Sequence, residues 1–226
     1  MARAVLSLSG VRLELLPSGA LFWPARRLLC VSDLHLGKSS RMARGAGPLL
    51  PPYETAATLE RLDQDLRATD ARTVVCLGDS FDDDRAAAEL TLADGERLRA
   101  LMAGREWIWV EGNHDPGHPF PVGRHVAELS LGPLVFRHIA RTGATAEISG
   151  HYHPKVPLPV GGSRPAALLD AGRLILPAYG VYTGGLRADR PPLSHLVGPD
   201  AMALVLGDPP RPAPLAALCR GRIRTR

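Results

Sequence analysis

The chain has 226 residues, of which 45% are hydrophobic and 22% charged, and its formal net charge is +4. This balance is typical of a globular protein with a proper core and excludes a disordered chain. No apolar run reaches the roughly 18 residues that a membrane span needs, and the N-terminus lacks a signal-peptide cleavage pattern, so we expect a cytoplasmic protein without a membrane partner.

The positive charge is concentrated at the C-terminus. Four of the last seven residues are arginines, and without them 27 − 4 = 23 basic residues balance 23 acidic ones. We therefore predict a single domain over residues 1–219 and a basic tail over residues 220–226, which can either contact a polyanion or be a solvated end. The three cysteines are odd in number and far apart, which favours reduced residues over a disulfide framework: Cys30, Cys76 and Cys219.

The first half of the chain alternates between predicted strands and helices. Residues Val11 to Trp23 alternate around a turn and predict a hairpin. An apolar run predicts a strand over Leu28 to Ser32, and a Gly/Pro-rich loop is expected from Gly37 to Pro52. Leucines at helical spacing predict a helix over Glu54 to Ala68.

A further strand is predicted over Thr73 to Leu77, followed by a helix that Asp83 or Asp84 caps and that runs toward Met102. The second half is mostly strand, with runs at Trp107 to Val110, Leu134 to Phe136, Ala146 to Ser149, Leu174 to Leu176 and Ala201 to Leu206. This order suits an α/β fold in which two mixed β-sheets face each other and helices flank them.

Four short polar strings each follow an apolar run. They are Asp33-Leu34-His35, Gly78-Asp79, Gly112-Asn113-His114-Asp115 and Gly150-His151-Tyr152-His153, and His138 follows a fifth run. Loops at strand ends are where α/β folds bring functional groups together. Residues two apart on a strand point the same way, so Asp-x-His and His-x-His can serve one ion or two adjacent ions.

The oxygen and imidazole donors of these strings suit Mn²⁺, Fe or Zn²⁺, with Mg²⁺ also open, and no thiolate is among them. Seven such donors are too many for one ion with an open position, but they suit two ions. Two ions about 3.5 to 4 Å apart can clamp the attacking and leaving oxygens of a phosphoryl transfer and generate a hydroxide nucleophile. The donors are Asp33, His35, Asp79, Asn113, His138, His151 and His153.

The ordered strings D-x-H, G-D, G-N-H-D, an isolated H and G-H-x-H resemble the calcineurin-like metallophosphoesterase superfamily. The resemblance implies that Asp79 bridges two metal ions. It implies that one ion is also held by Asp33, His35 and His153, and the other by Asn113, His138 and His151. His114 would protonate the leaving oxygen or stabilise the transition state, oriented by Asp115, and would not be a metal ligand.

A narrower resemblance covers nearly the whole chain. The strings DLHLGKS, LPPYE, LGDSFDDD, EGNHDP, GHYHPK and LPAYGVYTGGL are similar to the bacterial ligase-associated DNA damage response endonucleases. That resemblance implies Mn²⁺-dependent cleavage of DNA beside a DNA ligase, an exonuclease and a helicase of a repair cluster. One departure is the run from Asp82 to Asp84, where the family has His-Asp. We interpret this run as a capping turn in preference to a third metal site.

Of the 27 basic residues, only Lys38 and Lys155 are lysines, and both lie beside a histidine-bearing string. We expect them to contact the phosphate, although an ordinary surface role is the alternative. The Gly37-Lys38-Ser39 string is not a P-loop, because Ser32 stands where the upstream glycine belongs. Trp107 and Trp109 are expected in the core.

Three functions remain open from the sequence. The leading hypothesis is a two-metal phosphodiesterase that cleaves DNA, as a repair-associated endonuclease on single strands. The second is an enzyme that acts on a small nucleotide or another small phosphoester. The third is a non-catalytic adaptor of the same fold, which the presence of His114 beside Asp115 argues against.

Overall fold

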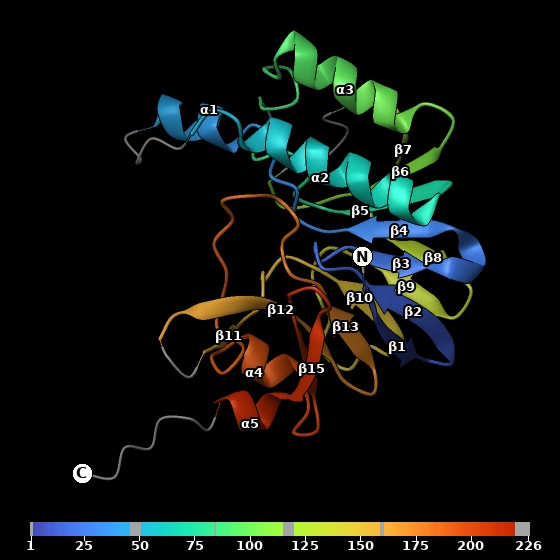
Figure 1. Ribbon diagram of the computed structural model, residues 1–226, viewed down its shortest axis with the longest axis vertical. Coiled ribbons are helices and arrows are strands. Elements are labelled where there is room, and N and C mark those ends of the chain that lie inside the picture. The colour runs from blue at the N-terminus through green and yellow to red at the C-terminus, as the bar shows by residue number, and fades with distance from the viewer. Residues whose placement is uncertain (1, 46–50, 84, 115–119, 159–160, 220–226) are drawn as a thin grey trace.

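The computed structural model of the chain describes residues 2–45, 51–83, 85–114, 120–158 and 161–219. Two β-sheets lie between outer helices (Figure 1). In the first sheet the strands follow chain order: β1 (Ala4–Leu8), β2 (Val11–Leu15), β3 (Leu21–Trp23), β4 (Leu28–Val31), β5 (Thr73–Leu77), β6 (Glu106–Val110) and β7 (Arg124–Val126). Strands β1 to β4 pair antiparallel, whereas β4 to β7 pair parallel.

The second sheet has the order β15-β14-β12-β13-β10-β9-β8, and β11 pairs with β12. Its central strands β9, β10 and β13 are parallel, and its other pairs are antiparallel. The strands are β8 (Leu129–Leu131), β9 (Leu134–Phe136), β10 (Glu147–Ser149), β11 (Lys155–Pro157), β12 (Ser163–Leu169), β13 (Arg173–Ile175), β14 (Met202–Val205) and β15 (Arg211–Pro214). Both sheets are therefore mixed, as the sequence predicts.

Helices cover the outer faces of both sheets (Figure 1). On the side of the first sheet lie α1 (Lys38–Arg44), α2 (Glu54–Thr69) and α3 (Leu92–Met102). The short helices α4 (Leu193–Leu196) and α5 (Leu215–Cys219) lie on the side of the second sheet. A 3-10 turn, η1 (Pro24–Arg26), joins β3 to β4.

Side-chain alternation along β5 separates two hydrophobic layers. Val74 and Cys76 belong to the core beneath α2 and α3, whereas Val75 and Leu77 belong to the core between the two sheets. This alternation arises because successive strand residues point to opposite faces. A continuous apolar run therefore makes a strand that is buried on both faces.

Most predicted elements are confirmed, including the N-terminal hairpin, the helix α2 and the strands β4, β5 and β6. The predicted loop from Gly37 to Pro52 is wrong in part, because its first residues form α1. Residues 46–50 of that loop lie outside the described residues. Trp107 and Trp109 are buried, as expected.

The predicted cap of α3 is also wrong. The helix begins at Leu92, and the Thr91 hydroxyl accepts a hydrogen bond from the Asp94 backbone N–H at 3.1 Å. Asp83 instead accepts from the backbone N–H groups of Arg85 and Ala86, at 3.2 and 2.9 Å, and so stabilises a turn before the helix. Asp83 is therefore a capping residue, as predicted, but it caps the turn that contains Arg85 and Ala86 and not α3.

None of the described helices combines the length and the apolar character that a bilayer crossing requires. Cys30, Cys76 and Cys219 form no disulfide with one another, as predicted.

Tyr179 fixes the segment after β13 against both α2 and the end of β4. Its side chain is fully buried, and its hydroxyl donates to Asp65 Oδ2 at 2.8 Å. Its backbone N–H donates to the Ser32 carbonyl at 2.7 Å. Burial raises the pKa of the Asp65 carboxyl group, which the Tyr179 hydrogen bond opposes. A buried carboxylate depends on such partners.

Replacing Tyr179 by Phe should therefore lower the free energy of unfolding by about 1 to 3 kcal/mol, because the Asp65 carboxylate loses a buried donor. Urea unfolding monitored by circular dichroism measures the change. The matched control is Tyr182→Phe at an exposed tyrosine, which should change the free energy by less than about 0.5 kcal/mol. Equal effects of the two substitutions would contradict the role of the Tyr179 hydroxyl.

Candidate metal centre

The polar strings meet where the two sheets face each other. Asp33, Asp79 and Asn113 follow β4, β5 and β6, which are adjacent parallel strands of the first sheet. His138 and His151 follow β9 and β10, which are adjacent parallel strands of the second sheet. The carboxyl ends of five strands therefore converge on one place, as the strand-end rule predicts.

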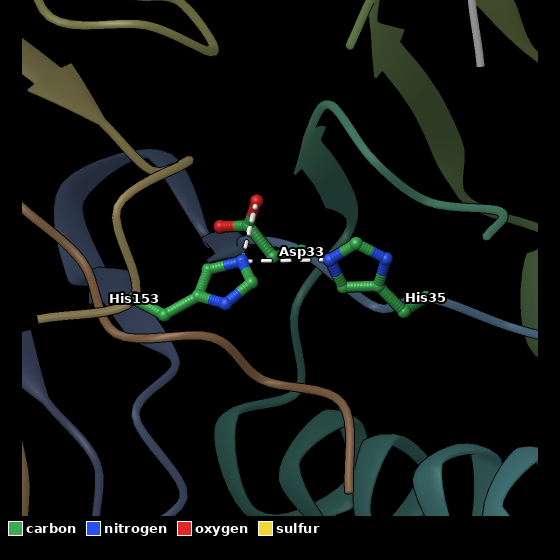
Figure 2. A group of neighbouring side chains, drawn as sticks. All are labelled: Asp33, His35 and His153. Atoms are coloured by element: carbon green, nitrogen blue, oxygen red, sulfur yellow. Dashed lines mark hydrogen bonds and ion pairs between the residues drawn. The ribbon is translucent and has the colours of Figure 1, made fainter. Parts of the chain in front are cut away.

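The first group of donors comprises Asp33, His35 and His153. Figure 2 shows the three side chains pointing toward one another. His153 Nε2 lies 3.2 Å from Asp33 Oδ1 and 3.4 Å from His35 Nε2. Asp33 is completely buried and His35 nearly so, which keeps bulk water from competing for these donors.

The second group comprises Asp79, His138 and His151, and Asn113 adjoins it. His138 Nε2 lies 2.9 Å from Asn113 Oδ1 and 3.3 Å from Asp79 Oδ1. His151 Nδ1 lies 3.1 Å from the same nitrogen of His138. The two groups adjoin each other, since His138 Nδ1 is 3.9 Å from Asp33 Oδ1.

Contacts on the far side of two imidazole rings fix their tautomers. His138 Nδ1 lies 2.9 Å from the Leu77 carbonyl, and His35 Nδ1 lies 2.8 Å from Asp82 Oδ1. The Leu77 carbonyl oxygen can only accept, so its hydrogen bond holds a proton on His138 Nδ1. The Asp82 carboxylate forms an ion pair with His35, and its charge favours a proton on the Nδ1 that faces it. In a neutral ring the lone pair is then on Nε2, which faces the other donors.

These donor sets fit divalent metal ions. Donor atoms at about 2.1 Å from one ion stand about 3.0 to 3.4 Å apart at bond angles between octahedral and tetrahedral. Five separations between neighbouring donors lie in that range or within 0.1 Å of it, from 2.9 to 3.4 Å. The ligand atoms of each group all lie within 4.8 Å of one another. Lone pairs of nitrogen and oxygen that face one another repel, and a cation between them removes the repulsion. Nitrogen and oxygen donors suit Mn²⁺, Fe or Zn²⁺.

The backbone at the site is unusual. Five candidate ligands have positive φ angles although none is a glycine: Asp33 (53°), His35 (47°), Asp79 (45°), His151 (70°) and His153 (47°). Such left-handed residues are uncommon, and they gather at functional sites where the surrounding structure holds them. The expectation that Asp-x-His and His-x-His point their side chains by strand alternation is therefore wrong. The residues converge through tight left-handed turns after the strands.

Two glycines allow this close packing. A Cβ atom at Gly78 would stand 2.5 Å from the imidazole of His138, and one at Gly150 would stand 1.7 Å from the Ser32 hydroxyl and 2.5 Å from Asp33 Oδ2. Any larger residue would displace a candidate ligand or the group that holds it. The glycines of the G-D and G-H-x-H strings are therefore required by the geometry of the site.

Both buried carboxylates remain ionised because of their partners. Burial alone would raise the pKa of Asp33, but hydrogen bonding and charge interactions with His153, together with His138 and Ser32, lower it. Burial likewise opposes ionisation of Asp79, yet His138 and the His114 backbone N–H hold its pKa well below the usual range. Burial would lower the pKa of His138, but Asp79 and Asp33 outweigh it and raise that pKa. The charges are mutually stabilised.

His114 lies at the exposed mouth of the site. Its backbone N–H donates to Asp79 Oδ1 at 2.9 Å, and its ring Nδ1 lies 3.0 Å from the Asp82 carbonyl oxygen. This contact requires a proton on Nδ1, which leaves Nε2 as the nitrogen that can take or give a proton. Asp115, which the resemblance assigns to orient His114, lies outside the described residues.

Asp82 is a residue that the sequence reasoning missed. Its side chain is buried, contacts His35 through Oδ1, and accepts from Arg41 Nε through Oδ2. Burial opposes its ionisation, but His35 and Arg41 lower the pKa of Asp82 to about 2. The interpretation of the aspartate run as a capping turn holds for Asp83 and is wrong for Asp82, whereas Asp84 lies outside the described residues. A signal was present, since Asp82 stands where the resembling family has a histidine.

Of the remaining predicted site residues, Asn113 contacts the second group, and the two lysines follow ligands of the first group in the chain. Asn113 is exposed beside His138, Lys38 begins α1 three residues after His35, and Lys155 begins β11 two residues after His153. The Lys155 side chain passes close to Gly185. Asp79 groups with the second set of donors, so its predicted role as a bridge between two ions stays a prediction.

Comparison with known proteins defines the class. Residues 26–162 match the calcineurin-like phosphoesterase family, and the chain belongs to that family. It is a metal-dependent hydrolase of phosphoesters. A search of curated proteins finds no match.

Among solved structures, the chain is similar to the nuclease MPE of Pseudomonas putida, with a TM-score of 0.78 and 29% sequence identity. The similarity covers 94% of this chain and 100% of that one, which is consistent with the resemblance to the repair endonucleases. The phosphoesterase Yfce of E. coli matches at a TM-score of 0.41 and 15% identity, over 83% of this chain and 98% of that one.

Replacing Asp82 by Asn should weaken metal binding about 10- to 100-fold, because the carboxylate that orients His35 loses its charge. Titration of metal-free protein with Mn²⁺ in a calorimeter measures the affinity directly and does not depend on turnover. The matched control is the neighbouring Asp83→Asn, which removes a charge of equal size from a partly exposed turn. If both variants bind Mn²⁺ as tightly as the unaltered protein, Asp82 does not position a ligand.

Proposed function

We propose that this phosphoesterase cleaves phosphodiester bonds in DNA, acts as an endonuclease on single strands and uses Mn²⁺. The observation that carries the proposal is the similarity to a bacterial nuclease over the whole of that chain at 29% identity. The convergence of the seven predicted donors and of His114 at one site supports it. The narrower resemblance stated above points to the same substrate.

The positions of the side chains suggest the catalytic role of each. Two divalent ions, when bound, would supply Lewis acidity and would lower the pKa of water for the attack on phosphorus. In our proposal the ions are held by Asp33, His35 and His153 on one side and by the Asp79 group on the other. His114 gives a proton from Nε2 to the leaving oxygen, while the Asp82 carbonyl keeps its ring in place.

A surface hollow beside the second group offers a path for the substrate. Its volume is about 390 Å³, and its lining includes Asn113, His138 and Arg141. The Arg141 side chain is mostly exposed and can meet a phosphate. We propose Lys38 and Lys155 as further phosphate contacts, because each lies close in sequence to a ligand of the first group.

The cellular setting belongs to the proposal as well. An enzyme of this kind would act in the cytoplasm in DNA repair, with a DNA ligase, an exonuclease and a helicase as functional associates. The arginine-rich residues 220–226 are suited to a polyanion by composition alone.

The test is cleavage of a circular single-stranded DNA by metal-stripped protein to which Mn²⁺, Mg²⁺ or Zn²⁺ is restored separately. Linearisation should require metal and be fastest with Mn²⁺. The His114→Ala variant should cut about 10² to 10⁴-fold more slowly, as expected for the loss of a general acid. Asp79→Ala should abolish cutting, whereas His195→Ala, at an exposed histidine on α4, should cut normally.

A small ester separates the chemistry from the substrate. Bis-p-nitrophenyl phosphate has a leaving group that needs little protonation, so His114→Ala should impair its hydrolysis less than the cleavage of DNA. If the circle survives while this ester is hydrolysed, the phosphoesterase acts on small phosphoesters and the DNA assignment is wrong.

A further inference from the structure

Two tyrosines project from the surface beside the first donor group. Tyr53 is 57% exposed and Tyr182 is 48% exposed, and their ring centroids lie 6.4 Å apart at an interplanar angle of 62°. Among the described residues, several large hydrophobic side chains are exposed, and of these only Tyr53 and Tyr182 are aromatic. Both belong to strings, LPPYE and LPAYGVYTGGL, for which the metal chemistry gives no reason.

Tyr182 is tied to the metal centre at both ends of its loop. The Gly180 backbone N–H donates to the Asp33 carbonyl at 3.1 Å, and the Leu186 N–H donates to the Tyr152 carbonyl at 3.2 Å, next to His153. Two residues of chain span at most about 7 Å, so Tyr182 lies within that reach of the backbone that contacts Asp33.

The conformation of Tyr182 is held in place despite its cost. Its φ angle of 57° is left-handed, which is unusual for a residue with a large side chain. The Val181 N–H donates to the Thr58 hydroxyl at 3.2 Å, and the Thr183 hydroxyl donates to the Gly180 carbonyl at 3.0 Å, so bonds on both sides secure it. Backbone strain that the surrounding bonds maintain near a candidate site is typical of functional residues, which favours a function for the Tyr182 ring.

Tyr53 lies next to residues that bond to the segment after His35. It directly precedes α2, whose first residue, Glu54, accepts from the Ser39 N–H at 3.0 Å. The Thr55 hydroxyl accepts from the Gly37 N–H at 2.9 Å, two residues after His35. The two rings are thus carried by segments that bond to the backbone of Asp33 and to the residues that follow His35.

A hollow of about 480 Å³ adjoins Tyr182, and Arg61 and Thr183 also line it. This volume lies in the range of small-ligand pockets, so a nucleobase has room there. An exposed aromatic ring stacks on any base, because every base has a π-face, and it does so only if the base is not already stacked in a duplex.

We propose that Tyr53 and Tyr182 form a base-stacking platform that holds single-stranded nucleic acid while its phosphate lies at the metal centre. The inference rests on the proposed nuclease function and deepens it, because it gives a physical reason for a preference for single strands. In this arrangement a phosphate of the strand lies at the metal donors. The flanking bases stack on the two tyrosine rings or enter the hollow beside Tyr182.

The experiment compares two single-stranded oligonucleotides of equal length, one with normal bases and one with abasic sites throughout its centre. For the unaltered enzyme, kcat/KM should be higher on the base-bearing strand. In Tyr53→Ala and Tyr182→Ala that preference should fall roughly 5- to 100-fold, mainly through KM, since stacking on an aromatic side chain contributes that range per base. The conservative Tyr53→Phe and Tyr182→Phe variants keep the ring and should retain the preference.

The matched control is Val5→Ala on the edge strand β1, where the side chain is 57% exposed, as Tyr53 is. It should behave as the unaltered enzyme does. If the enzyme cuts DNA but the alanine variants keep the full preference for base-bearing strands, the platform is overturned while the nuclease function stands. If the unaltered enzyme cuts neither oligonucleotide, the proposed function fails, and the platform fails with it.

Discussion

The structure depends on keeping two carboxylates, Asp33 and Asp79, ionised inside the protein. A buried charge is costly unless it is paired and hydrogen-bonded. Asp33 receives the backbone N–H of His151 at 3.0 Å and faces His153, while Asp79 receives the N–H of His114 and faces the ring of His138. Because these partners come from both sheets, satisfying the two carboxylates fixes how the ends of the sheets meet.

The same constraint explains the local backbone. Strands β4 and β5 bring Asp33 and Asp79 to one edge of the sheet. If the chain stayed extended after β4, it would carry His35 away from Asp33. Left-handed turns at Asp33, His35 and Asp79 fold the side chains back toward one centre. Each such residue costs of order 1 to 3 kcal/mol, and the buried apolar layers on both sides of the first sheet offset that cost.

The sequence predicted the features that local pattern determines. Apolar runs located β4 and β5, the leucine spacing located α2, and each polar string was assigned to a strand end, where the structure has it. Sequence patterns did not predict the features that depend on contacts between residues far apart in the chain. Helix α1 has little apolar patterning and stands against α2 through the Ser39 to Glu54 hydrogen bond. The role of Asp82 depends on His35 and Arg41, which lie far from it in the chain.

We propose that two divalent ions bind side by side between the sheets, one in each donor group. Crystals of the protein grown with Mn²⁺ and measured at the manganese absorption edge test it most directly. The account predicts two anomalous peaks about 3.5 to 4 Å apart, one among Asp33, His35 and His153 and the other among Asp79, His138 and His151. A single peak at saturating Mn²⁺, or two peaks away from these side chains, would contradict it.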